Sequence, residues 1–240
     1  YKDGRFSTGQ YNMAEYNADF LVTAQKDKIA DSKISGMLSV GGNLMNRQYN
    51  SFYATAEGLN IPELYTIQNG QSKTTSTSKS EKEVQSLYAL GQLSWDNYLF
   101  LDITVRNDWS STLSHTKHEG RGYFYPSVGT SLILSRLLTL PEWVSYAKVR
   151  AAYSMVGNDI PLYITNSASH ITAGGEYLAN DAAPFKEMEP EMNYSWEIGA
   201  EGRFLNSRIG FNITFYRTNT HNQFFKLPTL AGDKYAYRYV

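Results

Sequence analysis

Hydrophobic and polar side chains alternate along much of this chain with a period of two. The clearest case is the stretch NYLFLDITVRND, at 97–108. One parity carries Leu99, Leu101, Ile103 and Val105, and the other carries Phe100, Asp102, Thr104 and Arg106. Because alternate side chains of an extended strand point to opposite faces, the stretch predicts a strand with one apolar face and one charged face.

Seven further segments alternate in the same way, although Tyr88 and Leu90 lie on the polar parity of one of them. They span 17–26, 33–45, 83–95, 124–135, 146–156, 192–204 and 208–216. Strands of soluble sheets usually have about five or six residues. These segments are longer, and they match the roughly 9 to 11 residues of a tilted strand that crosses a membrane.

The connections between the expected strands alternate between short and long. Short ones fall around 27–32, 95–97 and 205–207, an intermediate one at 137–145, and long ones at 46–82, 109–122 and 157–191. In an antiparallel up-and-down sheet, every second connection lies at the same end. The pattern therefore predicts an all-β, antiparallel up-and-down transmembrane β-barrel segment of about 8–10 strands, with short periplasmic turns and long extracellular loops. A soluble all-β binding module is the alternative that this pattern leaves open.

Composition narrows the function classes. The 240 residues carry a formal net charge of −1 and include no cysteine, so a polyanion-binding surface and thiol chemistry are not indicated. The 19 tyrosines, 11 phenylalanines and 4 tryptophans suit a boundary between an apolar and a wet phase. The sequence starts at Tyr1 without an apolar leader, so we expect any signal peptide to be removed or to lie outside it.

Four stretches, in order, resemble the SusC/RagA family of TonB-dependent outer-membrane transporters. They are LYALGQLSWDNYLFLDITVRNDWSS, GYFYPSVGTSLILS, AKVRAAYSMVGN and EPEMNYSWEIGAEGRFLNSRIGFNITFYRTNTHNQ. The resemblance implies a barrel of about 22 strands. It also implies an N-terminal plug domain and a TonB-box segment, neither of which is visible in 1–240, so this chain would be part of the barrel domain, from its C-terminal half.

The same resemblance implies a location and partners. The location is the outer membrane of a Gram-negative cell, and the expected function is import of bulky nutrients, either oligosaccharide (glycan) or peptide. The expected partners are outer-membrane lipid, a SusD-like surface lipoprotein that closes over the barrel mouth, and the TonB complex acting through the N-terminal region. A small non-transporting barrel, serving in adhesion or as a structural anchor, is the alternative function. No nucleic-acid partner and no cofactor are expected.

Candidate chemistry is sparse, and we expect no enzyme activity. The loop HTKHEG holds His115, His118 and Glu119, but their order matches no zinc-protease motif. Asn158, Asp159 and Asp181 could offer oxygen atoms to calcium, yet no EF-hand-like spacing is present, so no metal site is predicted.

Two sets of side chains remain as site candidates. Charged residues on the polar parities are expected to form structural ion pairs that line a lumen: Asp102, Arg106, Arg150, Glu197 and Glu201. In particular, Arg150 is expected beside Glu201, with Glu197 as the second choice. Aromatic residues of the long loops are expected to contact substrate: Tyr49, Phe52, Tyr53, Trp109, Tyr163 and Tyr177.

Overall fold

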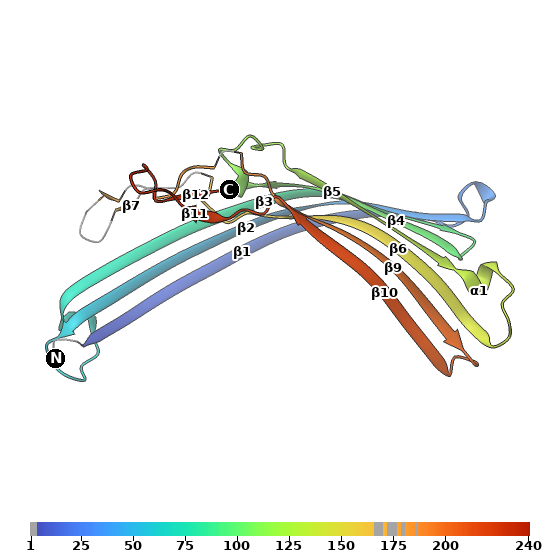
Figure 1. Cartoon of the computed structure of the whole chain (residues 1–240), viewed down its shortest axis with the longest axis horizontal. Coiled ribbons are helices and arrows are strands. Elements are labelled where there is room, and N and C mark those ends of the chain that lie inside the picture. Colours follow the sequence, from blue (N-terminus) through green and yellow to red (C-terminus); the bar gives the residue numbers. More distant parts are fainter. Residues whose placement is uncertain (1–3, 166–169, 172–176, 179–180, 186) are drawn as a thin grey trace.

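The structure, a computed structural model, describes residues 4–165, 170–171, 177–178, 181–185 and 187–240. Its main feature is one curved antiparallel sheet of eight strands, shown in Figure 1. The sheet order is β1-β2-β3-β4-β5-β6-β9-β10. These strands are β1 Arg5–Lys26, β2 Ile34–Leu59, β3 Gly70–Trp95, β4 Leu99–Ser110, β5 Tyr123–Ile133, β6 Val144–Asn158, β9 Glu191–Phe204 and β10 Ile209–His221.

The remaining elements are short. They are the 3-10 turns η1 Ile29–Asp31, η2 Ile67–Asn69 and η3 Ser111–Leu113, the helix α1 Leu134–Leu137, and the strand pairs β7 His170–Ile171 with β8 Tyr177–Leu178 and β11 Lys226–Pro228 with β12 Tyr237–Tyr239. Among the described residues, no helix is long and apolar enough to cross a membrane.

The predicted strands and their order are confirmed. All eight segments pair antiparallel with their chain neighbours, which is the arrangement expected of a stretch of barrel wall. The turn from β3 to β4 and the turn from β9 to β10 lie at one end of the sheet, together with η1 and α1. The longer connections lie at the other end (Figure 1). One boundary was wrong, since β5 stops at Ile133 and α1 follows where the pattern predicted strand to 135.

The prediction of a long loop at 46–82 is wrong. Strands β2 and β3 continue in register far beyond the predicted ends, so the connection shrinks to 60–69. The Ser/Thr/Lys-rich tract Ser72–Ser80 is part of β3 and pairs with Glu57–Tyr49 of β2. Together with β1, these two strands form a three-stranded extension past the ends of the other five, which we call the overhang. The composition of Ser72–Ser80 resembles a loop because its side chains are polar and mostly exposed on both faces.

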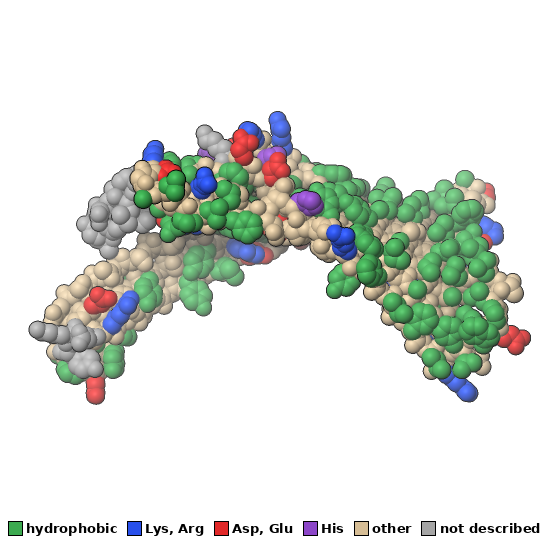
Figure 2. Space-filling model, in the orientation of Figure 1, with side chains coloured by type: hydrophobic (Ala, Val, Ile, Leu, Met, Phe, Trp, Pro, Cys, Tyr) green, Lys and Arg blue, Asp and Glu red, His purple; other side chains and the backbone are tan. Residues whose placement is uncertain are grey.

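The strand register divides the sheet into two faces. Ile103, for example, lies between Gly91 of β3 and Val128 of β5, whereas Arg106 lies between Tyr88 and Tyr125. The face that includes Ile103 is called the outer face. It carries exposed apolar side chains from every strand: Phe20, Val22, Leu38, Val40, Leu87, Leu93, Val128, Val149, Ile198, Phe211, Ile213 and Phe215. Figure 2 shows hydrophobic side chains gathered over the end of the sheet where β10 turns.

The opposite face, called the inner face, supports the small core of the molecule. Three segments outside the sheet fold together near it, namely 111–122, the described parts of 159–190, and 222–240, which Figure 1 shows gathered around β11 and β12. The buried side chains of the core are Leu113, Ile160, Ile164 and Met188 of these segments and Tyr123 of β5, with Tyr125, Phe185, Phe224 and Tyr239 packed against them. Long-range hydrophobic contacts therefore fix these segments over one end of the inner face.

Candidate functional site

The inner face is a polar wall across β6, β9 and β10. Arg150 on β6 faces Gly199 on β9 in the register. Because glycine has no side chain, the guanidinium lies flat across this position; a Cβ there would come within 2.8 Å of Arg150 Nε. From this position Arg150 Nη2 donates to Thr214 Oγ1 at 2.6 Å and to Asn212 Oδ1 at 3.3 Å on β10. Three adjacent strands are thus joined by one side chain.

The expected partners of Arg150 lie on the same face, but they are arranged differently from the first expectation. Arg150 Nε lies 3.8 Å from Glu197 Oε1, so the second choice is the residue in contact. Glu201 instead accepts from Arg203 Nη2 of its own strand at 2.9 Å. In the register Glu201 stands opposite Lys148. Both signs of charge therefore occur side by side along this part of the wall.

Asp102 and Arg106 share the inner face, but each has a different partner there. Asp102 accepts from Gln92 Nε2 at 2.6 Å. Arg106 donates to Asp108 Oδ1 at 2.7 Å and to Ser86 Oγ at 2.9 Å. The Tyr125 hydroxyl also donates to Asp108. This network places a fully paired charge cluster just below the loops.

Polar pairs continue along the inner face of β1 and β2. Arg47 Nε lies 2.6 Å from Glu15 Oε2, its direct neighbour in the register. Farther toward the turn, Asn43 Nδ2 donates to Asp19 Oδ1 at 2.6 Å. Sequence reasoning did not single out these pairs. The polar parity of the predicted strands 17–26 and 33–45 already held Asp19 and Asn43, whereas Glu15 and Arg47 lie beyond the predicted ends of those strands.

Asp159 is the main contact between the loops and the wall. Its carboxylate lies 2.7 Å from Lys82 Nζ of β3, and both side chains are mostly buried. Ser110 Oγ donates to it at 2.6 Å, and the Thr112 hydroxyl is a further donor. The carboxylate therefore holds β3, the end of β4 and the loop together through several donors. The residue considered as a calcium ligand is thus engaged by a lysine, and no group of three or more potential metal ligands occurs among the described residues.

The five candidate aromatic residues whose side chains are described are distributed over both faces of the sheet and one loop. Tyr49 and Tyr53 point to the inner side of the overhang, whereas Phe52 has the opposite parity on the same strand. Trp109 belongs to β4 and to the outer face. The Tyr163 hydroxyl accepts from the backbone N–H of Glu81 at 3.3 Å. The side chain of Tyr177 lies outside the described residues.

The histidine-containing loop has ordinary polar partners. The His115 backbone N–H donates to Glu119 Oε2 at 2.9 Å. His118 Nε2 lies 3.3 Å from Glu189 Oε1, which joins this loop to the connection before β9.

In the overhang, hydrogen bonds from Asn46 and Gln48 lower the pKa of Glu81 below the ordinary value of a glutamate. These contacts hold segments together and form no catalytic arrangement among themselves.

An outward apolar face, an inward polar face and loops sorted to one end are the features of an outer-membrane barrel wall. The family described as "TonB dependent receptor-like, beta-barrel" matches residues 1–240, the whole of the sequence. This chain belongs to that family. The barrel wall of a TonB-dependent receptor places it in the Gram-negative outer membrane, with the outer face toward lipid and the overhang and long connections toward the cell exterior. No curated protein matches the sequence.

Solved structures of this family have the same architecture. The RagAB peptide transporter superposes with a TM-score of 0.77 at 18% identity, over 97% of this chain and 27% of that one. The "open-open" state of the RagAB peptide importer gives 0.77 at 17% identity, over 97% and 26%. The ferripyoverdine receptor of the outer membrane of Pseudomonas aeruginosa gives 0.56 at 14% identity, over 97% and 29%. The chain therefore spans about a quarter of the length of these receptors, and at such identities the likeness establishes the fold.

Proposed function

We propose that the protein is a TonB-dependent importer of bulky nutrients in which this chain forms part of the lumen wall. The observation that carries the proposal is the inner face, where pairs of oppositely charged side chains join β1 to β2 and β6 to β9 and also occur within β4 and within β9. A wall of this kind stays hydrated and offers exchangeable hydrogen bonds to a passing polar solute.

Peptide is the cargo that these residues favour over oligosaccharide. A peptide carries ammonium, carboxylate and amide groups, so it can exchange partners with Arg150, Glu197 and Lys148 as it passes. A neutral glycan would depend mainly on aromatic stacking, and the candidate aromatic residues point to different faces. The fold that this chain shares with the RagAB peptide transporter supports the same choice.

The proposed import also requires other domains and partner proteins. A plug domain elsewhere in the protein would close the lumen, the TonB complex would supply the energy, and a SusD-like surface lipoprotein would cover the mouth. The loop segments joined by Asp159 and the inner tyrosines of the overhang, Tyr49 and Tyr53, would form the surface that cargo and lid meet first. This last assignment extends the loop-aromatic prediction to two of its six residues.

Uptake by whole cells tests the proposal. A strain lacking the gene should lose uptake of labelled oligopeptides, and the complete gene should restore it. Dissipating the proton-motive force should stop uptake in the complemented strain, because TonB coupling depends on that force. Loss of labelled oligosaccharide uptake instead would change the cargo class. Unchanged uptake of both, combined with altered cell adhesion or envelope integrity, would favour the non-transporting barrel.

A variant pair separates the wall from general folding. Arg150→Ala removes the cation that joins β6, β9 and β10, and we expect lower peptide uptake with normal amounts of folded protein. Ile198→Ala serves as the matched control, because Ile198 lies on β9 but on the lipid side, and this variant should leave uptake unchanged. Equal uptake by both variants would show that the polar array is structural only.

A further inference from the structure

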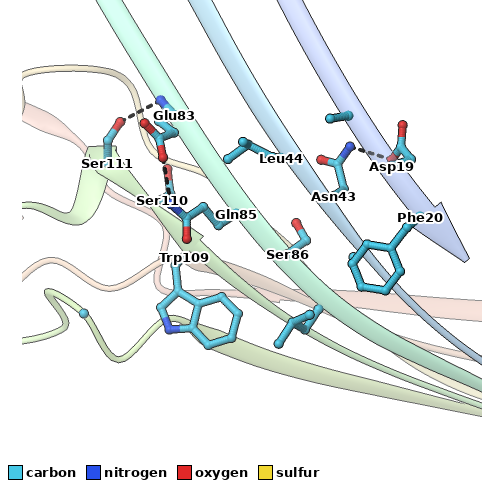
Figure 3. A pocket seen from close by; sticks show the side chains of 14 residues that line it. Asp19, Phe20, Asn43, Leu44, Glu83, Gln85, Ser86, Trp109, Ser110 and Ser111 are labelled. Carbon is cyan, nitrogen blue, oxygen red and sulfur yellow. Dashed lines mark hydrogen bonds between the residues drawn. The ribbon is translucent and has the colours of Figure 1, made fainter.

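A groove of about 1010 Å³ crosses the outer face over β1, β2, β3 and β4, and Figure 3 shows the side chains that line it. Its apolar walls are Phe20, Leu44, Leu87 and Trp109. Its floor includes Gly42, where an added Cβ would lie 2.6 Å from the Phe20 ring. The volume is at the upper end of the roughly 300–1,000 Å³ of ligand pockets.

The groove lies at the level of the outer leaflet. Trp95 lies at the periplasmic end of β3, and Leu87 precedes it by about eight residues. At ~3.3 Å per residue and a tilt of ~40°, Leu87 therefore lies about 20 Å above that end, measured across the membrane. By the same reasoning Trp109, about ten residues beyond Leu99, lies at about 25 Å, the height of the whole apolar band. The apolar part of the groove is therefore within the acyl-chain region, and Trp109 marks the interface, where tryptophan is enriched.

The upper end of the groove is polar and acidic. Glu83 lies beyond the apolar band and accepts from Gln85 Nε2 at 2.7 Å. The Glu83 backbone N–H donates to Ser111 Oγ at 3.0 Å, which holds the loop above the groove against β3. Among the described residues that line the groove, none is a lysine or arginine. Glu83 can accept a hydrogen bond from a cationic donor.

We propose that this groove binds a lipid of the outer leaflet whose head group carries a primary ammonium. One acyl chain lies between Phe20, Leu44 and Leu87, and the ammonium donates to the Glu83 carboxylate. The apolar walls lie within the acyl-chain region, and Glu83 lies above them, where a head group would be. The proposed contacts are separate from the lumen, because Phe20, Leu44, Leu87, Trp109 and Glu83 have the parity opposite to that of the polar wall.

Photo-cross-linking tests the site in the full-length protein. The protein is reconstituted in vesicles that contain a phosphatidylethanolamine or a phosphatidylglycerol with a diazirine in one acyl chain, and cross-linked peptides are mapped by mass spectrometry. We expect several-fold more cross-links at Leu87 and Trp109 than at Ile198 and Phe215 of the same face, and only with the ethanolamine lipid. Glu83→Gln should remove the head-group preference and keep the protein folded, as judged by heat-modifiability on gels.

Two alanines on the outer face of β1 supply a filling variant and its control. Ala18 lines the groove, whereas Ala24 lies on the same face nearer the periplasmic turn and outside it. Ala18→Phe should reduce the cross-links at Leu87 several-fold, and Ala24→Phe should leave them unchanged. Cross-links spread evenly over the outer face, equal yields for both lipids, or equal effects of the two substitutions would each overturn the proposal and leave only bulk lipid around the barrel.

Discussion

Ile103 lies near the middle of the apolar band on the outer face of β4, and replacing it by arginine tests the assignment of the two faces directly. It follows Leu99 by about four residues, which at ~3.3 Å per residue and ~40° tilt is about 10 Å from the periplasmic side of a band about 25 Å tall. Its side chain is 43% exposed in the sheet, so in the membrane it meets lipid rather than protein.

The expected cost depends on depth and on face. Arginine near the bilayer midplane on the lipid side costs about 2–4 kcal/mol, whereas near an interface it costs about 0–1 kcal/mol. Ile103→Arg should therefore weaken folding about 30-fold to 1,000-fold, at about tenfold per 1.4 kcal/mol. Leu99→Arg, at the interface of the same strand, should have little effect. Thr104→Arg points to the hydrated inner face and should also be tolerated.

Folding of the full-length protein into vesicles, followed by heat-modifiability on gels and by urea titration, measures the three variants. The order expected for the loss of folded protein is Ile103→Arg far above Leu99→Arg and Thr104→Arg. Equal losses for Ile103→Arg and Thr104→Arg would show that the faces are assigned wrongly. Equal losses for Ile103→Arg and Leu99→Arg would show that these two residues lie at similar depths in the membrane, contrary to the heights derived above.

Three further predictions concern the loops and the wall. A protease site inserted at Glu63, in the connection between β2 and β3, should be cut on intact cells. One inserted at Asn206 should be cut only after the outer membrane is opened, and the reverse pattern would invert the topology. Asp159→Asn should raise the rate of amide hydrogen exchange in 111–122 and 158–165 and leave β9 unchanged, because one charged hydrogen bond contributes about 1.5–3 kcal/mol to stability. Unchanged exchange in the loops would mean that hydrophobic packing alone fixes them. A double-mutant cycle of Arg150 with Glu197 should give a coupling of at most about 1 kcal/mol, since a hydrated lumen screens the pair, and a larger value would indicate a dry lumen.

The strands were predictable because each has one face toward lipid and one toward water. Where the environment differs on the two sides, as at Leu99 to Arg106, a period of two appears in the sequence. Above the membrane both faces meet water, so the alternation disappears although the hydrogen-bonded ladder continues. This is why Ser72–Ser80 was predicted as a loop and Phe52 as a loop aromatic.

The candidate site was less predictable, for reasons that differ between residues. The neighbourhood of Arg150 and Glu197 followed from strand order and parity, but the choice between Glu197 and Glu201 depended on a register that only coordinates supply. The contact between Asp159 and Lys82 joins residues far apart in the chain through an irregular loop, and no periodic pattern encodes such a contact. Trp109 was assigned to a loop because its strand continues two residues past the predicted end.

The free edge of β3 in the overhang affects how densely copies of this receptor can crowd in the membrane. Strand β4 pairs with β3 only from Val84 toward the turn, so in the described part of the chain the segment from Gly70 to Ser80 has no strand on that side. Such an edge invites another strand. Two copies meeting edge to edge would bring Lys73 and Lys79 of each close together, with no acidic residue in either tract to offset them. Mutual repulsion at this height keeps neighbouring barrels from joining into a continuous sheet.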